Sequence, residues 1–576
     1  MGLLNSALHI GRSAILSYQG ALQTVGNNIS SAGSPDYTRL VPQLDPLQGN
    51  LLGRDLQPGA GVALTDIQRV IDEALEGRLR LAAGVQQETS VRQASLAQVE
   101  SFVDEISGVG LGSQLSAFWT IFDDLQNTPE DGAIRDLVIA RGEQLANSFQ
   151  TLRGQLIRLG QDIDGQIGSV VERADEIAAE IAELNQQITT SEAGRRGQAT
   201  ALRDQRDALL RELSLLFDVT VREQPDGTVN VYVGSEALIQ GARHRDLVAV
   251  TDVDGEFVRT SVRFADTDQE VQVRSGQLAG LIASREEDAY SRIAAIDQLA
   301  GAVVADVNRV HADGQGLAGF RAVTGSFDVL AANVPLNSAG AGLDYPPQNG
   351  SFYVTVTDDA TQTPVAYRID INLEGLPTDT TLESLVIDFN NQISGVNAAV
   401  TSDRRLAFTA EAGFSFTFGH DGQTHREDTS HVLAALGINT FFSGTDASNI
   451  AVADVIRADP DLLGAASVFL SGDGSNASRL AGLDSATSAR LPGASLMEFY
   501  GKIANSVAVA ASSANANVEA AGAILSSLTA QKESISGVNL DEEAISLLKF
   551  ERAFQGAARF VTVVDDLLGE LVSLIR

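Results

Sequence analysis

A single apolar stripe runs through residues 547–575, which read LLKFERAFQGAARFVTVVDDLLGELVSLI. Apolar side chains recur there every three or four residues, a spacing that places them along one narrow side of a helix, as in a coiled coil. A helix with one such stripe cannot bury it alone, so this segment needs a partner. The stripe consists of Leu547, Phe550, Phe554, Ala557, Val561, Val564, Leu568, Leu571 and Ile575.

The opposite end of the chain carries a matching stripe, made of Leu4, Leu8, Gly11, Ile15, Tyr18, Leu22, Val25 and Ile29. Two stripes at opposite termini predict that the terminal helices pack against each other or against equivalent helices of neighbouring subunits. This pattern is typical of a self-assembling structural protein rather than of an enzyme. Apart from Gly11 and Ala557, the members of the two stripes form the predicted assembly interface.

Composition narrows the class of protein. A chain of 576 residues with 44% hydrophobic and 20% charged residues has an ordinary globular composition and should split into several domains. A net charge of −35 argues against nucleic acid as a partner, because phosphate binding needs a basic surface. The absence of cysteine excludes disulfides and thiolate metal sites. No apolar run is long enough for a membrane span, and the N-terminus lacks the basic region of a cleavable signal peptide.

The periodicity changes from helical to strand-like and back twice along the chain. The N-terminal helix is expected to end near residues 27–30, and a long helix is expected to begin near residue 67, with Ile67, Val70 and Ile71 on its apolar face. Helices are also expected over 133–190 and 277–311, and the chain after 450 is expected to be mostly helical. The helix over 133–190 carries an apolar seam of Ile163, Ile167, Val170, Ala174, Ile177, Ile181, Leu184 and Ile188. The alternation of Val219, Val221 and 229–233 about Asp226-Gly227 predicts a hairpin.

The predicted fold class is multidomain α+β, with a coiled-coil-like helical stalk built from both termini and two inserted β-rich domains. The expected parts are terminal helices at 1–45 and 536–576, a discontinuous helical domain at 46–216, 275–318 and 451–535, a small β-rich domain at 217–274, and an outer β-rich domain at 319–450.

Several motifs resemble the family of flagellar rod, hook and hook-associated proteins. At the N-terminus these are Val25–Ser30 and Ser34–Arg39, and at the C-terminus Ser536–Glu543 and Phe550–Gln555. The chain departs from the family pattern with Asp36 in place of a glycine and Gly33 in place of an asparagine. Internal segments are similar to the hook-associated members in particular: Arg203–Asp207, Asp226–Val231, Leu436–Asn439, Phe442–Ser448 and Phe499–Gly501.

The resemblance implies a structural adaptor that joins the flagellar hook to the filament and is needed for filament assembly. It implies a homo-oligomeric ring or tube as the assembled state, and the hook protein and the next hook-associated protein as partners. It also implies an extracellular location at the hook–filament junction, type III export without a cleavable signal peptide, and a cytoplasmic chaperone that holds the C-terminal helix. Alternatives are a hook or distal rod protein and, from other classes, an extracellular enzyme or adhesin on a flagellar scaffold.

The motifs that could carry chemistry are weak. His420, His425 and His431 lie near Asp421, Glu427 and Asp428, but their spacing fits no common ligand pattern, which favours a polar surface loop. Residues 472–477 match a dinucleotide-binding fingerprint, yet their helical neighbours predict a plain turn. We therefore expect no catalytic residue, no cofactor and no metal ligand.

Overall fold

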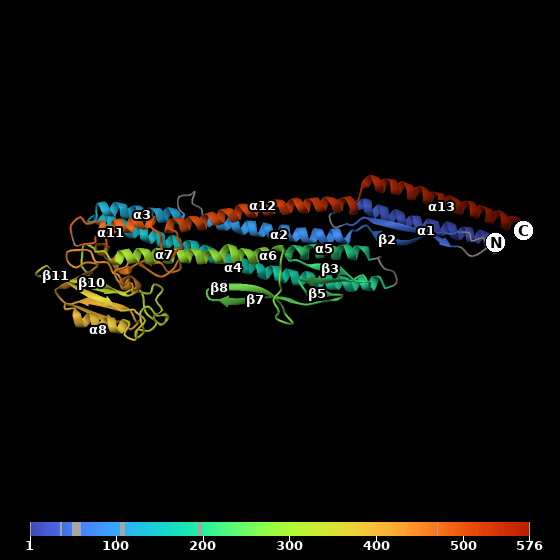
Figure 1. The fold of residues 1–576 in the computed structure, drawn as a ribbon. Helices are drawn as coiled ribbons and strands as arrows, with labels where there is room; N and C mark the ends of the chain where they lie inside the picture. The colour runs from blue at the N-terminus through green and yellow to red at the C-terminus, as the bar shows by residue number, and fades with distance from the viewer. Residues whose placement is uncertain are drawn as a thin grey trace. The chain divides into compact units, whose positions relative to one another are not determined.

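The computed structural model describes residues 2–34, 37–48, 59–103, 110–193, 199–468 and 470–574. It is a mixed helical and sheet protein (Figure 1), and its chain divides into two compact units. The first unit contains residues 1–94, 162–284 and 513–576, and the second contains 95–161 and 285–512. Among the described helices, none is long and apolar enough to cross a membrane. The domain boundaries expected from the sequence stay predictions.

The two ends of the chain come together in the first unit. Helix α1 (Gly2–Ser30) packs along α13 (Leu540–Leu574), and the hairpin of β1 (Leu40–Gln48) and β2 (Gly59–Arg69) lies against α1 (Figure 1). Ser17 fixes the hairpin, because its Oγ donates to the carbonyl of Val62 at 3.0 Å and accepts from the amide of Leu64 at 3.0 Å. Helix α1 therefore has a helix on one side and a strand on another.

The core of the first unit is built from long helices. These are α5 (Thr200–Leu216) and α6 (Gly276–Ala283), with parts of α2 (Glu73–Phe102), α4 (Gly132–Ser191) and α12 (Leu496–Ser536). The seam predicted on α4 is buried within this unit at Ile163, Ile167, Val170, Ala174, Ile177, Ile181 and Ile188. Gly280 of α6 allows a close helix approach, since a Cβ there would lie 2.7 Å from the carbonyl oxygen of Glu88 on α2.

Polar side chains of α4 hold the strands of the first unit. The sheet β3 (Thr220–Glu223), β4 (Val229–Val233), β5 (Glu236–Gln240) and β6 (Arg243–His244) is antiparallel, as is the ribbon β7 (Leu247–Asp254) with β8 (Phe257–Phe264). Asp164 accepts from the amide of Thr260, Asp175 from that of Leu247 and Asn185 from that of Val229, at 2.7–3.1 Å. The predicted hairpin about Asp226-Gly227 is present as β3–β4.

The second unit combines helices with small sheets. Its helices are the remaining parts of α2, α4 and α12, together with α3 (Leu111–Asn127), α7 (Ser291–Ala312), α8 (Leu382–Gln392), α9 (Val432–Ala435), α10 (Asp454–Ala458) and α11 (Ser475–Ala481). Rings of Phe118, Phe122, Phe441 and Phe442 contact one another at centroid distances of 4.7–6.1 Å. These contacts attach α3 to the segment that resembles hook-associated proteins.

The sheets of the second unit are antiparallel. One has the order β11 (Thr363–Ile371), β10 (Gly350–Asp358), β14 (Phe414–Phe418) and another the order β12 (Val396–Val400), β13 (Leu406–Ala410), β9 (Ala322–Thr324). The bridge β15 (Phe442–Ser443) with β16 (Ala451–Val452) is shorter. Short 3-10 helices lie at Ala339–Ala341, Pro460–Leu462 and Gly482–Asp484.

Two sequence predictions of local structure are wrong. Ile67 belongs to β2 and α2 begins only at Glu73, because pairing of Leu40 with Arg69 extends the strand. The helix expected over 277–311 is divided into α6 and α7 by a π-helical segment at Ser284–Tyr290. The chain after 450 is mostly helical, as expected, although short helices and turns precede α12 between 450 and 495.

Candidate assembly interface

Small residues of α1 let α13 approach closely. A Cβ built on Gly11 would lie 2.4 Å from Cγ2 of Val561, so only glycine fits this position without a shift. Two turns further along α1, the rings of Tyr18 and Phe550 lie 6.5 Å apart between centroids. The stripes at the two termini thus meet within one chain.

The structure places the predicted interface residues mainly on the faces that α1 and α13 turn to each other and to the hairpin. Val25 and Val564 are buried. Half-buried positions are Leu8, Ile15, Tyr18, Leu22, Ile29, Leu547, Phe550, Phe554, Val561 and Leu568. The side chains of Leu4, Leu571 and Ile575 lie outside the described part of the chain. Whether any of these residues also contacts a neighbouring subunit stays a prediction.

A second apolar stripe on α13 was missed by the sequence analysis. Helical geometry puts Phe560, Val563 and Leu567 about 100° around α13 from members of the first stripe. Phe560 still lies at the edge of the contact with α1, since a Cβ on Gly11 would be 3.3 Å from its Cδ1. The large side chains of the second stripe are exposed by 42–68%, although a helix of a folded domain normally presents polar residues to solvent. The outer stripe consists of Ile545, Leu548, Phe560, Val563 and Leu567. The signal was present in the sequence as a second series of apolar residues beside the first.

The N-terminal and C-terminal motifs meet at one buried asparagine. Asn28 is fully buried, and its Nδ2 donates to the carbonyl of Leu40 at 2.8 Å and to Oε2 of Glu543 at 3.0 Å. Its Oδ1 accepts from the amide of Leu40 at 3.0 Å and from the hydroxyl of Tyr37 at 2.8 Å. All four hydrogen-bonding positions of this amide are therefore used. The motif that ends α1 and the motif that begins α13 are one structural feature.

Charged groups complete this contact. Arg39 donates from Nε to Oε1 of Glu543 at 2.9 Å and pairs through Nη1 with Glu542 at 2.9 Å. Glu543 is only 2% exposed, so its charge depends on these donors. Burial raises the pKa of Tyr37 to about 12, and the nearby carboxylates of Asp204 and Glu543 act in the same direction. The phenol therefore keeps the proton that it donates to Asn28.

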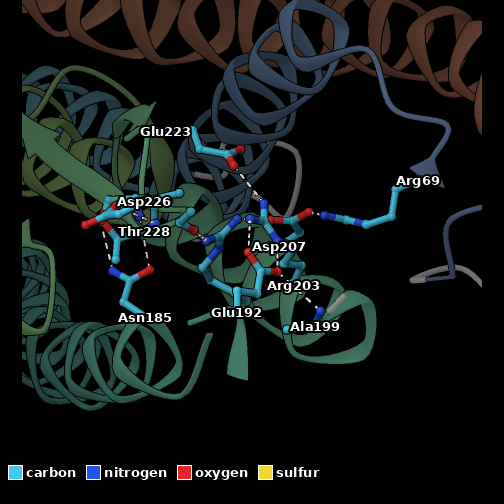
Figure 2. A network of polar contacts seen from close by, with 12 residues as sticks. Arg69, Asn185, Glu192, Ala199, Arg203, Asp207, Glu223, Asp226 and Thr228 are labelled. Carbon is cyan, nitrogen blue, oxygen red and sulfur yellow. Dashed lines mark hydrogen bonds and ion pairs between the residues drawn. The ribbon is translucent and has the colours of Figure 1, made fainter. Parts of the chain in front are cut away.

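A polar network explains why the segment 203–207 is rich in charge (Figure 2). Arg203 of α5 pairs with Glu192 at the end of α4 at 2.9 Å and with Glu223 of β3 at 2.7 Å. Arg206, which is also buried, donates to the carbonyl of Gly227 in the β3–β4 turn at 2.8 Å. The two arginines thus hold α5 against the β3–β4 hairpin.

Residues 203–207 also hold the β1–β2 hairpin, which lies against α1. Arg69, the last residue of β2, forms ion pairs with Asp204 and Asp207 of α5 (Figure 2). Elsewhere in the network, the side-chain amide of Asn185 on α4 binds Val229 of β4, donating through Nδ2 and accepting through Oδ1. Asp226 accepts a hydrogen bond from Thr228 within the turn. The internal motif at residues 203–207 therefore acts in packing, and it supports the terminal helices through β2.

The histidine cluster is not simply a polar surface loop, which corrects that expectation. His420 is buried; its Nε2 shares a hydrogen bond with Thr417 at 2.7 Å, its Nδ1 accepts from the amide of Gly422 at 3.0 Å, and burial lowers its pKa to about 4. His431 begins α9 in a left-handed conformation with φ of 57°. The predicted turn at 472–474 is present and leads into α11.

Comparison with known proteins gives a consistent result over the whole chain. Residues 96–326 match the family described as the flagellar hook-associated protein FlgK helical domain, and residues 517–574 match the flagellar basal body rod FlgEFG protein C-terminal family. Flagellar hook-associated protein 1 of Escherichia coli is 26% identical over 99% of this chain and 100% of its own length. The Bacillus subtilis protein of that name is 22% identical over 98% and 97% of the two chains.

A solved structure shows the same fold. It is described as the flagellar hook junction protein FlgK from Burkholderia pseudomallei, and it aligns with a TM-score of 0.50 and 17% identity over 80% of this chain and all of its own. Family matches in both halves of the chain, full-length relatives and a shared fold agree with one another. The chain thus carries FlgK-family domains and is similar along its full length to flagellar hook-associated protein 1, a structural protein of the junction between hook and filament.

Proposed function

We propose that this chain works as the adaptor between hook and filament, and that α13 makes the contacts that assemble it. The observation that carries the proposal is the outer stripe of α13. Within the described residues, α1 and the hairpin cover the first stripe, while Ile545, Leu548, Phe560, Val563 and Leu567 remain exposed. A helical stalk built from both termini with inserted β-rich parts would present this stripe to a neighbouring subunit.

The energetics favour assembly through that surface. Burying a large apolar side chain contributes roughly 1.5–3 kcal/mol, so five such residues offer a substantial driving force when a second copy covers them. Two apolar stripes on different sides of one helix suit a closed array, in which α1 covers one stripe of each α13 and a neighbouring subunit covers the other. This arrangement supports a ring or tube of identical subunits that contacts the hook protein at one end and the next hook-associated protein at the other.

The same surface constrains the protein before assembly. An exposed apolar stripe of this size is an aggregation liability in a free subunit. A cytoplasmic chaperone that covers the outer stripe of α13 until export would prevent this aggregation. The route that the resemblance implies is type III export, without cleavage of the N-terminus, to an extracellular place at the hook–filament junction. The family is structural, which is consistent with the expectation that the chain is not an enzyme.

Deleting the gene tests the overall function. Electron microscopy is expected to show finished hooks without filaments, and an assay of the medium is expected to find released flagellin. Missing hooks would indicate a rod or hook protein instead. Intact filaments would contradict the adaptor function altogether.

A pair of neighbouring substitutions tests the surface. Val563→Ser removes an apolar side chain from the outer stripe, whereas Thr562→Ser changes an exposed position about 100° away around the same helix. Both variants should fold, because both positions are exposed. The double variant Leu548→Ser with Val563→Ser is expected to fail in restoring filaments to the deletion strain. The control Thr562→Ser is expected to restore them. Full restoration by that double variant would exclude the outer stripe as the assembly surface.

A further inference from the structure

Two clusters of histidine and carboxylate side chains occur among the described residues. One contains Asp313, His425 and Glu427, and the other contains Asp175, His244 and Asp246. In each cluster the three ligand atoms lie within 4.8 Å of one another. One imidazole and two carboxylates are a donor set that suits zinc and similar divalent ions, whereas calcium and magnesium prefer oxygen alone. The surroundings of the two clusters differ.

The cluster in the second unit already contains a cation from the protein itself. Nη2 of Arg479 lies 2.8 Å from Glu427 and 3.3 Å from Asp313, and Nη1 donates to Nε2 of His425 at 3.2 Å. The guanidinium group thus binds all three potential ligands. A metal ion would have to displace it and would leave an arginine beside a second positive charge. Each of the three side chains in this cluster therefore already contacts a positive charge of the protein.

In the cluster of the first unit, the carboxylates contact a histidine and a backbone amide. Nε2 of His244 lies 3.1 Å from Oδ1 of Asp246, which follows β6 by two residues. Arg245, between them, is directed elsewhere: it pairs with Asp266 at 2.7 Å and lies 3.9 Å from the ring centroid of Phe264. The charge of the two carboxylates is therefore not neutralised by the nearest arginine.

Neighbouring hydrogen bonds hold the ligands in position. Oδ1 of Asp175, on α4, accepts from the amide of Leu247 at 2.8 Å, and this bond sets the direction of the carboxylate. The carbonyl of Asp246 accepts from the amide of Ala265 at 2.9 Å, which fixes the backbone at that ligand. Hydrogen bonds of this kind are what orient the ligands in protein metal sites.

We propose that Asp175, His244 and Asp246 bind one divalent transition-metal ion of the zinc class. Ligands about 2.1 Å from a tetrahedral zinc ion are separated by roughly 3.4 Å, so small side-chain rotations from the present separations are enough. Three protein ligands leave a fourth position for water. The ion joins α4 to the connection between β6 and β7, a cross-link of the kind that a protein without cysteine cannot make with a disulfide.

Calorimetric titration of the untagged full-length chain with zinc chloride at neutral pH tests the proposal. A millimolar excess of magnesium in the buffer suppresses non-specific binding to an acidic protein. We expect saturable binding of one ion, and His244→Gln should weaken the affinity at least 10-fold. His425→Gln makes the same chemical change in the cluster that contains Arg479, and it should leave the affinity unchanged.

Two further outcomes decide the assignment. Asp246→Asn changes an exposed carboxylate and should not impair folding, so it tests the site even where His244→Gln lowers stability. Cobalt bound to the wild type should give visible absorption bands that this variant lacks. Absence of saturable zinc binding, equal affinity in the wild type and His244→Gln, or loss of affinity only in His425→Gln would each overturn the proposal.

Discussion

Replacing Asn28 with alanine is expected to release the start of α13 from the hairpin. The side chain makes four hydrogen bonds in a fully buried position, and they join Leu40 and Tyr37 on one side to Glu543 on the other. Alanine leaves the carboxylate of Glu543 with fewer donors and the amide of Leu40 without its acceptor. Groups that remain buried without partners account for most of the cost.

The magnitude follows from the kinds of bond that are lost. Three are between neutral groups, each contributing about 0.5–1.5 kcal/mol, and one is to a carboxylate and contributes about 1.5–3 kcal/mol. Allowing for partial entry of water, the loss should be about 3–5 kcal/mol. A change of about 1.4 kcal/mol is tenfold in an equilibrium, so the local opening should become at least about 100-fold more frequent.

Amide hydrogen exchange followed by mass spectrometry is the suitable assay, because global unfolding of a chain with two units is not a two-state process. The amide of Leu40 donates to Oδ1 of Asn28 and reports the change directly. Asn27→Ala is the matched control, since the preceding asparagine on the same helix is exposed and its loss should change stability by less than about 0.5 kcal/mol. Equal exchange rates at Leu40 in the two variants would refute the reasoning.

Three further predictions address packing, charge and pH. Gly11→Val should weaken the contact of α1 with α13 by about 1–3 kcal/mol, because a Cβ would lie 2.4 Å from Val561. Adding Val561→Ala should restore part of the protection from amide exchange along α13, and no restoration would argue against this contact. Arg203→Met should cost about 3–5 kcal/mol by leaving a buried glutamate unpaired, and thermal unfolding like that of the wild type would contradict it. Burial lowers the pKa of His311 to about 4, so the unfolded chain binds more protons between about pH 4 and 6.5 and this group makes stability rise with pH there. Burial raises the pKa of Asp428 to about 6, so the folded chain binds more protons between about pH 4 and 6 and this group has the opposite sign. In denaturant titrations across this window, His311→Gln should flatten the pH dependence of stability and Asp428→Asn should steepen it; changes in the reverse directions would contradict both assignments.

Local patterns allowed much of the architecture to be predicted from the sequence. The end of α1 at Ser30, the β3–β4 hairpin about Gly227 and the buried seam of α4 all follow from chemistry within a few residues of each position. The start of α2 was misplaced because its apparent apolar face includes Ile67, which pairs in a strand instead. Strand pairing depends on a partner elsewhere in the chain, and periodicity in one segment does not report it.

The sequence by itself determined that both termini are amphipathic helices, and its motifs identified the family. Only the tertiary structure decided which side of α13 is covered by α1 and which side remains exposed. It also brought Asn28 to Glu543, placed Arg479 among His425, Asp313 and Glu427, and collected Asp175 with His244 and Asp246. The physical reason is that helical period and turn chemistry act over a few residues. Contacts between distant residues depend on how whole elements pack, and that packing minimises the free energy of the complete fold.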